Sequence, residues 1–378
     1  MKILRGYVFR LYPNKEQETL INKTIGSSRF IYNYLLNDRI NYYKETKKSK
    51  TLYEQNKMIP NLLEQYQFLK EVDSCALRTA SFNLEDAYKN FFNKSGFPKY
   101  KIKGIKESYK TNNIKSTYKG KEYNSIEINL EEKTIKLPKI KTIKIRGYRN
   151  LKEIKGNIKS AVIKKEAKKY YVSILVEEEL VRPAFNPNRI VGIDLGIKDL
   201  IVTSNNEKIK NTIKINEKRI KGLQKALSRS QKGSRNRNKI IQKIQRMWQK
   251  IKNARKHLIH QITNKIIEEN DIIAIEDLDI KKMYQNHRIA KQLTLNPLNE
   301  LVRVLKYKTE WKNKRLIQID RYYPSSQECN VCGYKNEKTK DLKIRNYECP
   351  KCHNELERDL NASINIMFEG IKQYMKII

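Results

Sequence analysis

Four cysteines near the end of the sequence have the spacing of a zinc-binding ribbon. They form two pairs, Cys329/Cys332 and Cys349/Cys352, with two residues inside each pair and sixteen residues between the pairs. Two thiolates in so short a loop can reach one tetrahedral ion, and the second pair completes the ligand set, so this zinc would be structural. Two disulfides are the alternative. Because the sequence shows no secretory signal and Cys75 would be left over, zinc is favoured.

Three acidic residues stand where they could hold a catalytic metal. Asp194 ends the apolar run RIVGIDLG (189–196), Glu276 lies late in DIIAIEDL (271–278), and Asp359 lies in the first turn of a helical segment. Carboxylate oxygens suit Mg²⁺, which takes the rest of its shell from water and substrate phosphate. Two such ions, about 4 Å apart, can activate a water and stabilise the leaving 3′ oxygen of a phosphodiester.

Each acid taken alone has an ordinary explanation. The chain has 41 Asp and Glu residues, most of which must be solvated, and an acid at a strand end is often only a helix cap. Asp277 and Asp279 beside Glu276, and Glu357 beside Asp359, illustrate how little a single carboxylate proves. The specificity of the prediction comes from all three acids falling in matching strand and helix contexts.

The elements that must position these acids follow in a recognisable order. We predict strands, helices and a closing helix in the order β-β-β-α-β-α-β-α, which is that of a ribonuclease-H-like domain with the zinc ribbon inserted before its last helix. In that topology the strands ending at Asp194 and Glu276 are parallel neighbours, and Asp359 reaches the same edge. The strands are expected at 189–196, 199–204, 207–210, 271–278 and 315–320, and the helices at 214–269, 297–311 and 357–374.

The first half of the chain has a different character. Residues 4–12 alternate like a strand, 15–92 have helical periodicity, and 95–101 form a turn. Short β-like runs between about 105 and 180 predict a small basic β-domain. The Pro- and Asn-rich segment 182–188 precedes the first fully apolar strand, so we place a domain boundary there.

The charge of the chain indicates its partners. Its 80 Lys and Arg against 41 Asp and Glu give a formal net charge of +39, which attracts polyanions. No apolar run is long enough to span a membrane, so nucleic acid is favoured over a membrane surface. The 23 tyrosines give weak support to a nucleic-acid partner, because aromatic rings stack on unpaired bases, although most tyrosines of any protein only pack against other side chains. Without a targeting peptide, the reducing cytoplasm is the expected location.

The most basic stretch is 207–256, with 18 Lys and Arg against two acids. About half of these charges are what the solvated face of a helical pair would carry. The others predict a phosphate-lined channel for a nucleic-acid duplex recognised by its backbone. The loop 228–238, with Arg229, Lys232, Arg235 and Arg237, is expected to be mobile and to gate the acidic site.

Seven segments of the sequence resemble the TnpB family, whose members are RuvC-type nucleases encoded by insertion sequences and similar to compact type V CRISPR effectors. The resemblance runs nearly end to end and its motifs are specific. The segments are FRLYPNKEQETLINKTIGSSRFIYN (9–33), LEDAYKNFF (84–92), GFPKYK (96–101), VGIDLGIKDL (191–200), IAIEDL (273–278), YPSSQECNVCGYKN (323–336) and ERDLNASINI (357–366).

The resemblance implies an RNA-guided DNA endonuclease. A guide RNA from the transposon end would pair with target double-stranded DNA beside a short flanking motif, and one RuvC site would cut both strands. It assigns Asp194, Glu276 and Asp359 to magnesium, with Mn²⁺ as a substitute, and the four cysteines to zinc. By analogy, the flanking motif would be read by Tyr53, Ser74, Arg78, Thr79 and the 110–125 stretch; Arg345 is a further expected nucleic-acid contact. A monomer in a bacterial or archaeal cytoplasm, associated with the nucleoid, is expected.

The same resemblance implies a multidomain α+β architecture: a RuvC nuclease domain with an inserted zinc ribbon, a small β-barrel-like wedge domain and a helical recognition domain. The expected boundaries are 1–14 for a wedge strand, 15–104 for the recognition helices, 105–185 for the wedge β-domain, 186–324 for the first RuvC part, 325–354 for the ribbon and 355–378 for the closing RuvC helix.

Two departures and two rival functions remain. His353 stands where the family has Gly after the last knuckle, and Glu357 replaces the first Asp of its His-Asp-Arg-Asp motif. His353 could compete as a zinc ligand, although four thiolates already fill a tetrahedron.

A nuclease-dead RNA-guided repressor would lack the triad that is complete here. A strand-transferring transposase would carry its acids in the order Asp-Asp-Glu, whereas this chain has Asp-Glu-Asp.

Overall fold

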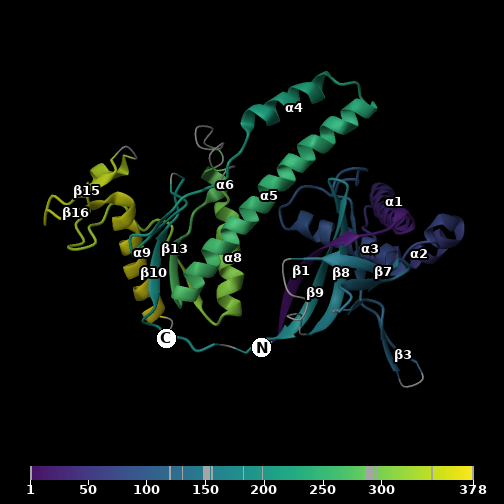
Figure 1. Cartoon of the computed structure of the whole chain (residues 1–378), viewed down its shortest axis with the longest axis horizontal. Helices are drawn as coiled ribbons and strands as arrows, with labels where there is room; N and C mark the ends of the chain where they lie inside the picture. Colours follow the sequence, from purple (N-terminus) through teal and green to yellow (C-terminus); the bar gives the residue numbers. More distant parts are fainter. Residues whose placement is uncertain are drawn as a thin grey trace. The chain divides into compact units, whose positions relative to one another are not determined.

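The computed structural model of the chain divides into two compact units, Met1–Leu180 and Val181–Ile378 (Figure 1). The division lies beside the Pro- and Asn-rich segment 182–188. No helix within the described residues combines the length and apolar content needed to cross a membrane. The structure describes residues 2–118, 121–129, 131–147, 154, 156–181, 183–197, 199–283, 285, 293, 296–341 and 344–376.

The first unit is built on a sheet whose central strand comes from the start of the chain. β1 (Lys2–Tyr12) lies between β9 and β7 in the order β2-β8-β9-β1-β7-β6-β5, with every ladder antiparallel. Its side chains alternate, so that Tyr7, Phe9 and Leu11 are buried in one core while Leu4 and Val8 are exposed. The other strands are β2 (Ser108–Asn112), β5 (Glu127–Asn129), β6 (Thr134–Leu137), β7 (Lys141–Arg146), β8 (Asn157–Glu166) and β9 (Lys169–Glu179), with a separate hairpin of β3 (Lys115–Tyr118) and β4 (Lys121–Asn124).

Three helices complete this unit: α1 (Lys15–Thr46), α2 (Leu52–Gln65) and α3 (Ser74–Phe92). α1 begins at Asn14 in a capping box, in which the Asn14 side chain accepts from the Gln17 backbone and Gln17 reciprocates. The helices share an apolar core that includes Leu35, Leu69 and Leu77.

The second unit contains a five-stranded sheet in the order β12-β11-β10-β13-β14. β10 is parallel to β13 and β13 to β14, while β11 and β12 are antiparallel additions. The central strands are apolar because both faces are covered, as is usual for parallel strands. Their bounds are β10 (Ile190–Asp194), β11 (Ile201–Thr203), β12 (Lys208–Ile209), β13 (Ile272–Glu276) and β14 (Arg315–Ile319).

Helices cover the two faces of this sheet in three layers (Figure 1). On one face, Ile193 and Ile275 pack in a core with α5 (Arg235–Glu269) and α8 (Leu298–Trp311). On the other face, Ala274 packs with Ile366 of α9 (Arg358–Met375). Successive residues of a strand point to opposite faces, so Asp194 and Glu276, which follow Ile193 and Ile275, belong to the face that α9 covers.

The remaining elements stand outside these layers. α4 (Glu217–Arg229) packs against α5, and the turn between them at 230–234 lies inside the break predicted over 228–238. A short helix, α6 (Ile280–Met283), follows β13. Between β14 and α9 lie a 3-10 turn, η3 (Glu337–Lys340), and a two-stranded ribbon of β15 (Asn346–Glu348) and β16 (Glu355–Glu357).

Candidate active site and metal centre

Asp194 and Glu276 are neighbours at one edge of the second sheet. Ile193 of β10 is paired with Ile275 of β13 in a parallel ladder, and each acid is the next residue of its strand. Parallel strands lie about 4.8 Å apart, so the two carboxylates leave the same edge on the same face. The sheet register, rather than any local feature, therefore brings these residues together.

Asp359 reaches that edge because α9 lies unusually close to the sheet. A Cβ atom on Gly192 would lie 2.1 Å from the Ser363 carbonyl oxygen, and one on Gly370 would lie 2.4 Å from the Ala274 Cβ. Only glycine permits such contact at both places. The first turn of α9, which carries Asp359, is thereby fixed over the ends of β10 and β13.

The other two acids act electrostatically on Asp194. Burial raises the pKa of Asp194 well above its ordinary value, the negative charges of Glu276 and Asp359 raise it further, and Arg358 opposes the shift. Burial also raises the pKa of Glu276, although the hydroxyl of Ser325, which donates to Glu276 Oε1, opposes this. Like charges in a poorly solvated place are what a divalent cation would relieve.

Two arginines stand beside Asp359. Arg345 Nη1 lies 3.7 Å from Asp359 Oδ2, and Arg358 Nε lies 3.6 Å from Asp359 Oδ1. The backbones of the two arginines are also hydrogen-bonded, since the Arg358 amide donates to the Arg345 carbonyl over 2.8 Å. Arg345, expected from the sequence to contact nucleic acid, keeps 49 % of its side chain exposed, whereas Arg358 is buried.

The four cysteines form a compact ligand set. The Sγ atoms of Cys329 and Cys352 are 3.6 Å apart, those of Cys332 and Cys349 are 3.5 Å apart, and all four lie within 4.8 Å of one another. Sulfur atoms 2.3 Å from a tetrahedral zinc would be about 3.8 Å apart, so the cluster fits a structural zinc. Among the described residues, it is the tightest grouping of potential metal ligands; His353 is not part of it, and the three acids are less tightly drawn together.

The two knuckles have the same backbone geometry despite their different sequences. The amide of Gly333 donates to the Cys329 carbonyl and that of His353 to the Cys349 carbonyl, both over 2.9 Å. Both residues have positive φ, 70° at Gly333 and 56° at His353. His353 therefore adopts the left-handed conformation that glycine takes in the first knuckle, at a cost of about 1–2 kcal/mol.

Backbone donors also favour the metal-binding form of one thiol. Burial works against ionisation of Cys349, but the amides of Cys352 and Lys351 outweigh it and lower the pKa of Cys349 to about 6. A thiolate rather than a thiol is the zinc ligand. In the same knuckle, the Asn354 amide lowers the pKa of Cys352, but burial and the neighbouring thiols outweigh it and raise that pKa to about 12, so Cys349 is the first of the pair to ionise.

Two asparagines of α9 join the cysteine ribbon to the acids. Asn361 accepts from the Asn330 amide at 3.1 Å and donates to the Glu328 carbonyl at 2.7 Å. Asn365 donates to the carbonyl of Ser325 at 2.8 Å, the residue whose hydroxyl holds Glu276. Sequence reasoning missed both asparagines. The available signal was a pair of poor helix formers four residues apart in a helical segment.

A lysine outside the ribbon also reaches the start of α9. Lys208 of β12 forms an ion pair with Glu357, the N-cap residue of α9, and this carboxylate raises the pKa of Lys208. Glu357 is one of the two residues at which the sequence departs from the family pattern, and it forms its ion pair with a lysine.

The predicted nucleic-acid residues of the first unit differ in accessibility. Tyr53 is 68 % exposed, with the Lys57 ammonium 4.5 Å from its ring centre. Arg78 is exposed on α3. Thr79 is buried and its hydroxyl donates to the Cys75 carbonyl at 2.8 Å, so it is the residue of this set least able to reach a ligand in this conformation.

The predicted residues of the basic loop also separate into two kinds. Arg229, Lys232 and Arg235 are exposed. Arg237 instead ends α4, because its guanidinium donates to the carbonyls of Leu227 at 2.6 Å and Ser230 at 3.1 Å. Its position therefore indicates a structural role in joining α4 to α5.

Comparison with known proteins places the whole chain among relatives of one kind. Family models match residues 1–48 (a helix-turn-helix domain), 173–287 (a "Probable transposase") and 299–366 (a "Cas12f1-like, TNB domain"). A Streptomyces pristinaespiralis protein named "Putative RNA-guided DNA endonuclease" is 31 % identical over 98 % of this chain and 90 % of its own length. An Escherichia coli K12 protein with the same name, InsQ, is 29 % identical over 98 % of this chain and 93 % of its own.

A solved structure shares the fold. The protein in a Cas12f1–sgRNA–target DNA complex matches with a TM-score of 0.58 over 97 % of this chain and 99 % of its own, at 14 % identity. The mixed α/β, multidomain architecture is therefore common to both proteins.

Proposed function

The chain belongs to the TnpB family, and from that premise we propose that it is an RNA-guided DNA endonuclease. Its reaction would be metal-dependent hydrolysis of phosphodiester bonds in target double-stranded DNA, at one RuvC-type site and next to a short flanking motif. The relatives' names support the class of activity. The gathering of Asp194, Glu276 and Asp359 at one sheet edge carries the proposal.

The layout of the second unit supports a ribonuclease-H-like assignment. Three strands run in the order β12-β11-β10 before β13 and β14 are added in parallel, and α9 closes the face that carries the acids. The acids come from two strand ends and a helix start, in the order Asp-Glu-Asp. That order favours RuvC over a strand-transferring transposase.

The donor set fits magnesium. It consists of carboxylates alone, and the mutual repulsion that raises the pKa of Asp194 would be relieved by a divalent cation. Asp194, Glu276 and Asp359 would hold Mg²⁺, and Mn²⁺ should be able to replace it. When bound, such ions activate a water and stabilise the leaving 3′ oxygen of the phosphodiester.

Other residues of the chain would orient these ligands and the substrate. Ser325 donates to one oxygen of Glu276, which would leave the other oxygen to bind the metal. Arg345 combines proximity to Asp359 with solvent exposure, so its guanidinium can meet a DNA phosphate entering the edge. Arg358 is buried and would hold the Asp359 carboxylate in place.

The charge of the chain supports the partners. Arg229, Lys232 and Arg235 project from the tip of the α4–α5 pair, where they can follow the backbone of a guide–target heteroduplex. In the first unit, the exposed Tyr53, Ser74 and Arg78 are candidates for reading the flanking motif. The guide RNA would come from the end of the mobile element that encodes the protein.

The test has two parts. Protein purified at moderate salt should carry a discrete RNA with defined ends, and that complex should cut matching double-stranded DNA in Mg²⁺. Glu276→Ala should abolish cutting of both strands without loss of DNA binding, since affinity comes from base pairing and the basic surface. Asp277→Ala is the matched control, because this neighbouring acid is 41 % exposed and pairs with Arg321 at 2.6 Å.

The outcomes separate the rival functions. Heterogeneous RNA fragments would favour nonspecific binding. Guided binding by wild-type protein without any cutting in Mg²⁺ or Mn²⁺ would identify a repressor, and joining of DNA strands would identify a transposase. Equal cutting by Glu276→Ala and wild-type protein would overturn the RuvC assignment.

A further inference from the structure

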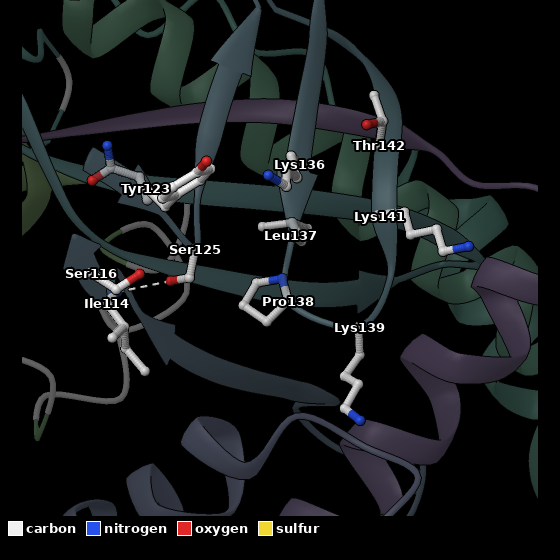
Figure 2. A pocket seen from close by; sticks show the side chains of 11 residues that line it. Ile114, Ser116, Tyr123, Ser125, Lys136, Leu137, Pro138, Lys139, Lys141 and Thr142 are labelled. Carbon is white, nitrogen blue, oxygen red and sulfur yellow. Dashed lines mark hydrogen bonds between the residues drawn. The ribbon is translucent and has the colours of Figure 1, made fainter. Parts of the chain in front are cut away.

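The first unit contains a cavity that none of the proposed catalytic or cysteine residues lines. It has a volume of about 490 Å³ and lies between the β3–β4 hairpin and the turn that joins β6 to β7. Figure 2 shows Tyr123 and Ser125 on one side and Lys136, Lys139 and Lys141 on the other, with Pro138 between them. Its volume is within the roughly 300–1,000 Å³ that small-ligand sites occupy.

The turn on the lysine side is held rigidly. Ile140 is buried at its centre, and Lys139 and Lys141 on either side have φ of 63° and 65°. The Gln17 side-chain amide at the start of α1 donates to the carbonyls of Ile140 and Thr142, at 3.2 and 2.9 Å. Two lysines in a conformation that favours glycine imply that the surroundings enforce the turn. The bases of both cationic side chains are therefore fixed, and Figure 2 shows them leaving the turn in different directions.

The chemistry of the lining selects an anion that carries a flat apolar group. Three lysines and no acid line the cavity. Lys136 is paired with Glu127 at 3.2 Å, whereas Lys141 forms no ion pair with any described residue. Pro138 supplies an apolar floor above the buried core residue Leu137, and Tyr123, which is 44 % exposed, supplies an aromatic wall.

Polar groups complete the lining at the rim. Ser116 stands opposite Tyr123 in the hairpin ladder, and Thr142 follows Lys141. Ser125 is already engaged, because its hydroxyl accepts from the Ile114 amide at 2.8 Å. Hydroxyls of this kind can satisfy the polar edge of a base without discriminating strongly among bases.

We propose that this cavity binds one unpaired nucleotide of a single-stranded polynucleotide. Tyr123 would stack on the base above Pro138, and Lys139 and Lys141 would contact the phosphates on its two sides. The inference rests on the proposed function in taking a polynucleotide as ligand. It goes further by assigning a pocket for a single extruded base, which a paired base inside a duplex could not enter.

Physical reasons favour an unpaired nucleotide over a duplex. Unstacked bases can be splayed out and stacked on aromatic side chains, whereas a duplex presents only its edges and backbone. Base–aromatic stacking tolerates any base, in agreement with the few polar groups at the rim. RNA and DNA share this chemistry, so the probes must distinguish them.

The experiment uses the full chain, stripped of nucleic acid in high salt, and twelve-nucleotide oligo(U) RNA, oligo(dT) DNA and a duplex of equal length. Binding is measured at a salt concentration where contacts to phosphate alone are weak. Tyr123→Ala should lower the affinity for single strands roughly five- to a hundredfold, and Tyr123→Phe should retain it. Tyr43→Ala, which truncates a tyrosine 54 % exposed on α1, is the matched control.

Two further measurements locate the site. A 5-iodouracil oligonucleotide should cross-link to Tyr123 on irradiation. Lys141→Gln should make the negative slope of log K against log salt shallower by about 0.7 for a single strand, while Lys144→Gln, which removes an exposed lysine of the same β-strand, should not. A preference for the RNA or the DNA probe identifies the natural strand, and either supports the site.

The experiments distinguish failure of the nucleotide site from failure of the proposed endonuclease function. If Tyr123→Ala binds single strands as Tyr43→Ala does, or if cross-links fall only outside residues 114–142, the cavity is not a nucleotide site. Guided cutting of DNA by the wild-type protein would still support the proposed function in that case. Preferential loss of duplex binding in Tyr123→Ala would also overturn the inference and would assign the cavity to the flanking DNA instead.

Discussion

The Asp194 carboxylate is costly for the protein to ionise without a cation nearby. Burial and two neighbouring acids raise the pKa of Asp194, so the folded state holds a proton that the unfolded state has already released. Between the unfolded pKa of about 3.9 and the raised folded value, the native state binds more protons, and stability falls as pH rises. Above the folded value the whole cost is present.

Asp194→Asn removes this cost and should stabilise the protein in the absence of added Mg²⁺. The gain in Tm should be small near pH 5 and grow to a few degrees by pH 8, since about 1 kcal/mol moves Tm by roughly 2–4 °C in a domain of this size. Thermal unfolding across that pH range measures it. The same variant should not cut DNA. A variant that is less stable than wild type at pH 8 would show that the Asp194 charge is compensated in the folded state.

The sequence predicts the acids but gives no sign of the residues that contact them. Asp194 and Glu276 are predicted because each lies at the end of an apolar run of strand length, a local pattern. Ser325, which holds Glu276 from 49 residues away, leaves no such pattern. Nothing in the sequence indicates that Arg358 is buried, because its burial against Asp359 depends on the ribbon folding beside it.

At the scale of elements, the position of α9 depends on two glycine contacts, and the closer of them is at Gly192. Gly192→Ala would place a methyl group 2.1 Å from the Ser363 carbonyl oxygen, so α9 must move away from β10. Overpacking of this kind costs about 1–3 kcal/mol, and the shift carries Asp359 away from Asp194. We expect a lower Tm and a larger proportional loss of cutting, measured on the same preparation.

Gly222→Ala is the control for that substitution. Gly222 lies in α4, and nothing lies within 4 Å of the position its Cβ would take. Alanine should therefore leave stability unchanged or raise it by up to about 1 kcal/mol through helix propensity. If both variants cut DNA at the wild-type rate, close packing of α9 does not position Asp359.

The cysteine ribbon is the second element on which the site depends. Cys332→Ser should leave three thiolates, lower the zinc content, and loosen the Glu328 and Ser325 carbonyls to which Asn361 and Asn365 are bonded. Cutting should fall together with zinc, measured by metal analysis and a cleavage assay. Cys75→Ser, in the other unit, should change neither. Disulfides without zinc in the purified protein would contradict the metal assignment.

Elements were more predictable than their pairings. The helix break between α4 and α5 was evident from the Gly- and Ser-containing loop. The order β2-β8-β9-β1-β7-β6-β5 was not, because β1 pairs with β9 across more than 150 residues, as in Tyr7 with Ile174. Local alternation shows which side chains of a strand are buried, and it contains no information about which distant strand lies beside it.

At the scale of the whole molecule, the net charge of +39 should make nucleic-acid affinity strongly dependent on salt. Replacing Arg229, Lys232 and Arg235 together by Gln should make the negative slope of log K against log salt shallower by roughly two to three, if each contacts a phosphate. Replacing Lys44, Lys47 and Lys48 at the end of α1 removes the same charge elsewhere. Equal slopes for the two triple variants would indicate a nonspecific effect of net charge rather than direct phosphate contacts by Arg229, Lys232 and Arg235.

The late position of α9 in the chain has a consequence for how the protein is made. Domains fold as they leave the ribosome, at about 5–20 residues per second, so Asp359 follows Glu276 by some 80 residues and several seconds. During that interval the sheet face beside Gly192 has no cover and the acids lack their third member. On the proposed function, a nascent chain that has begun to bind RNA would be unable to cut DNA until α9 has been made.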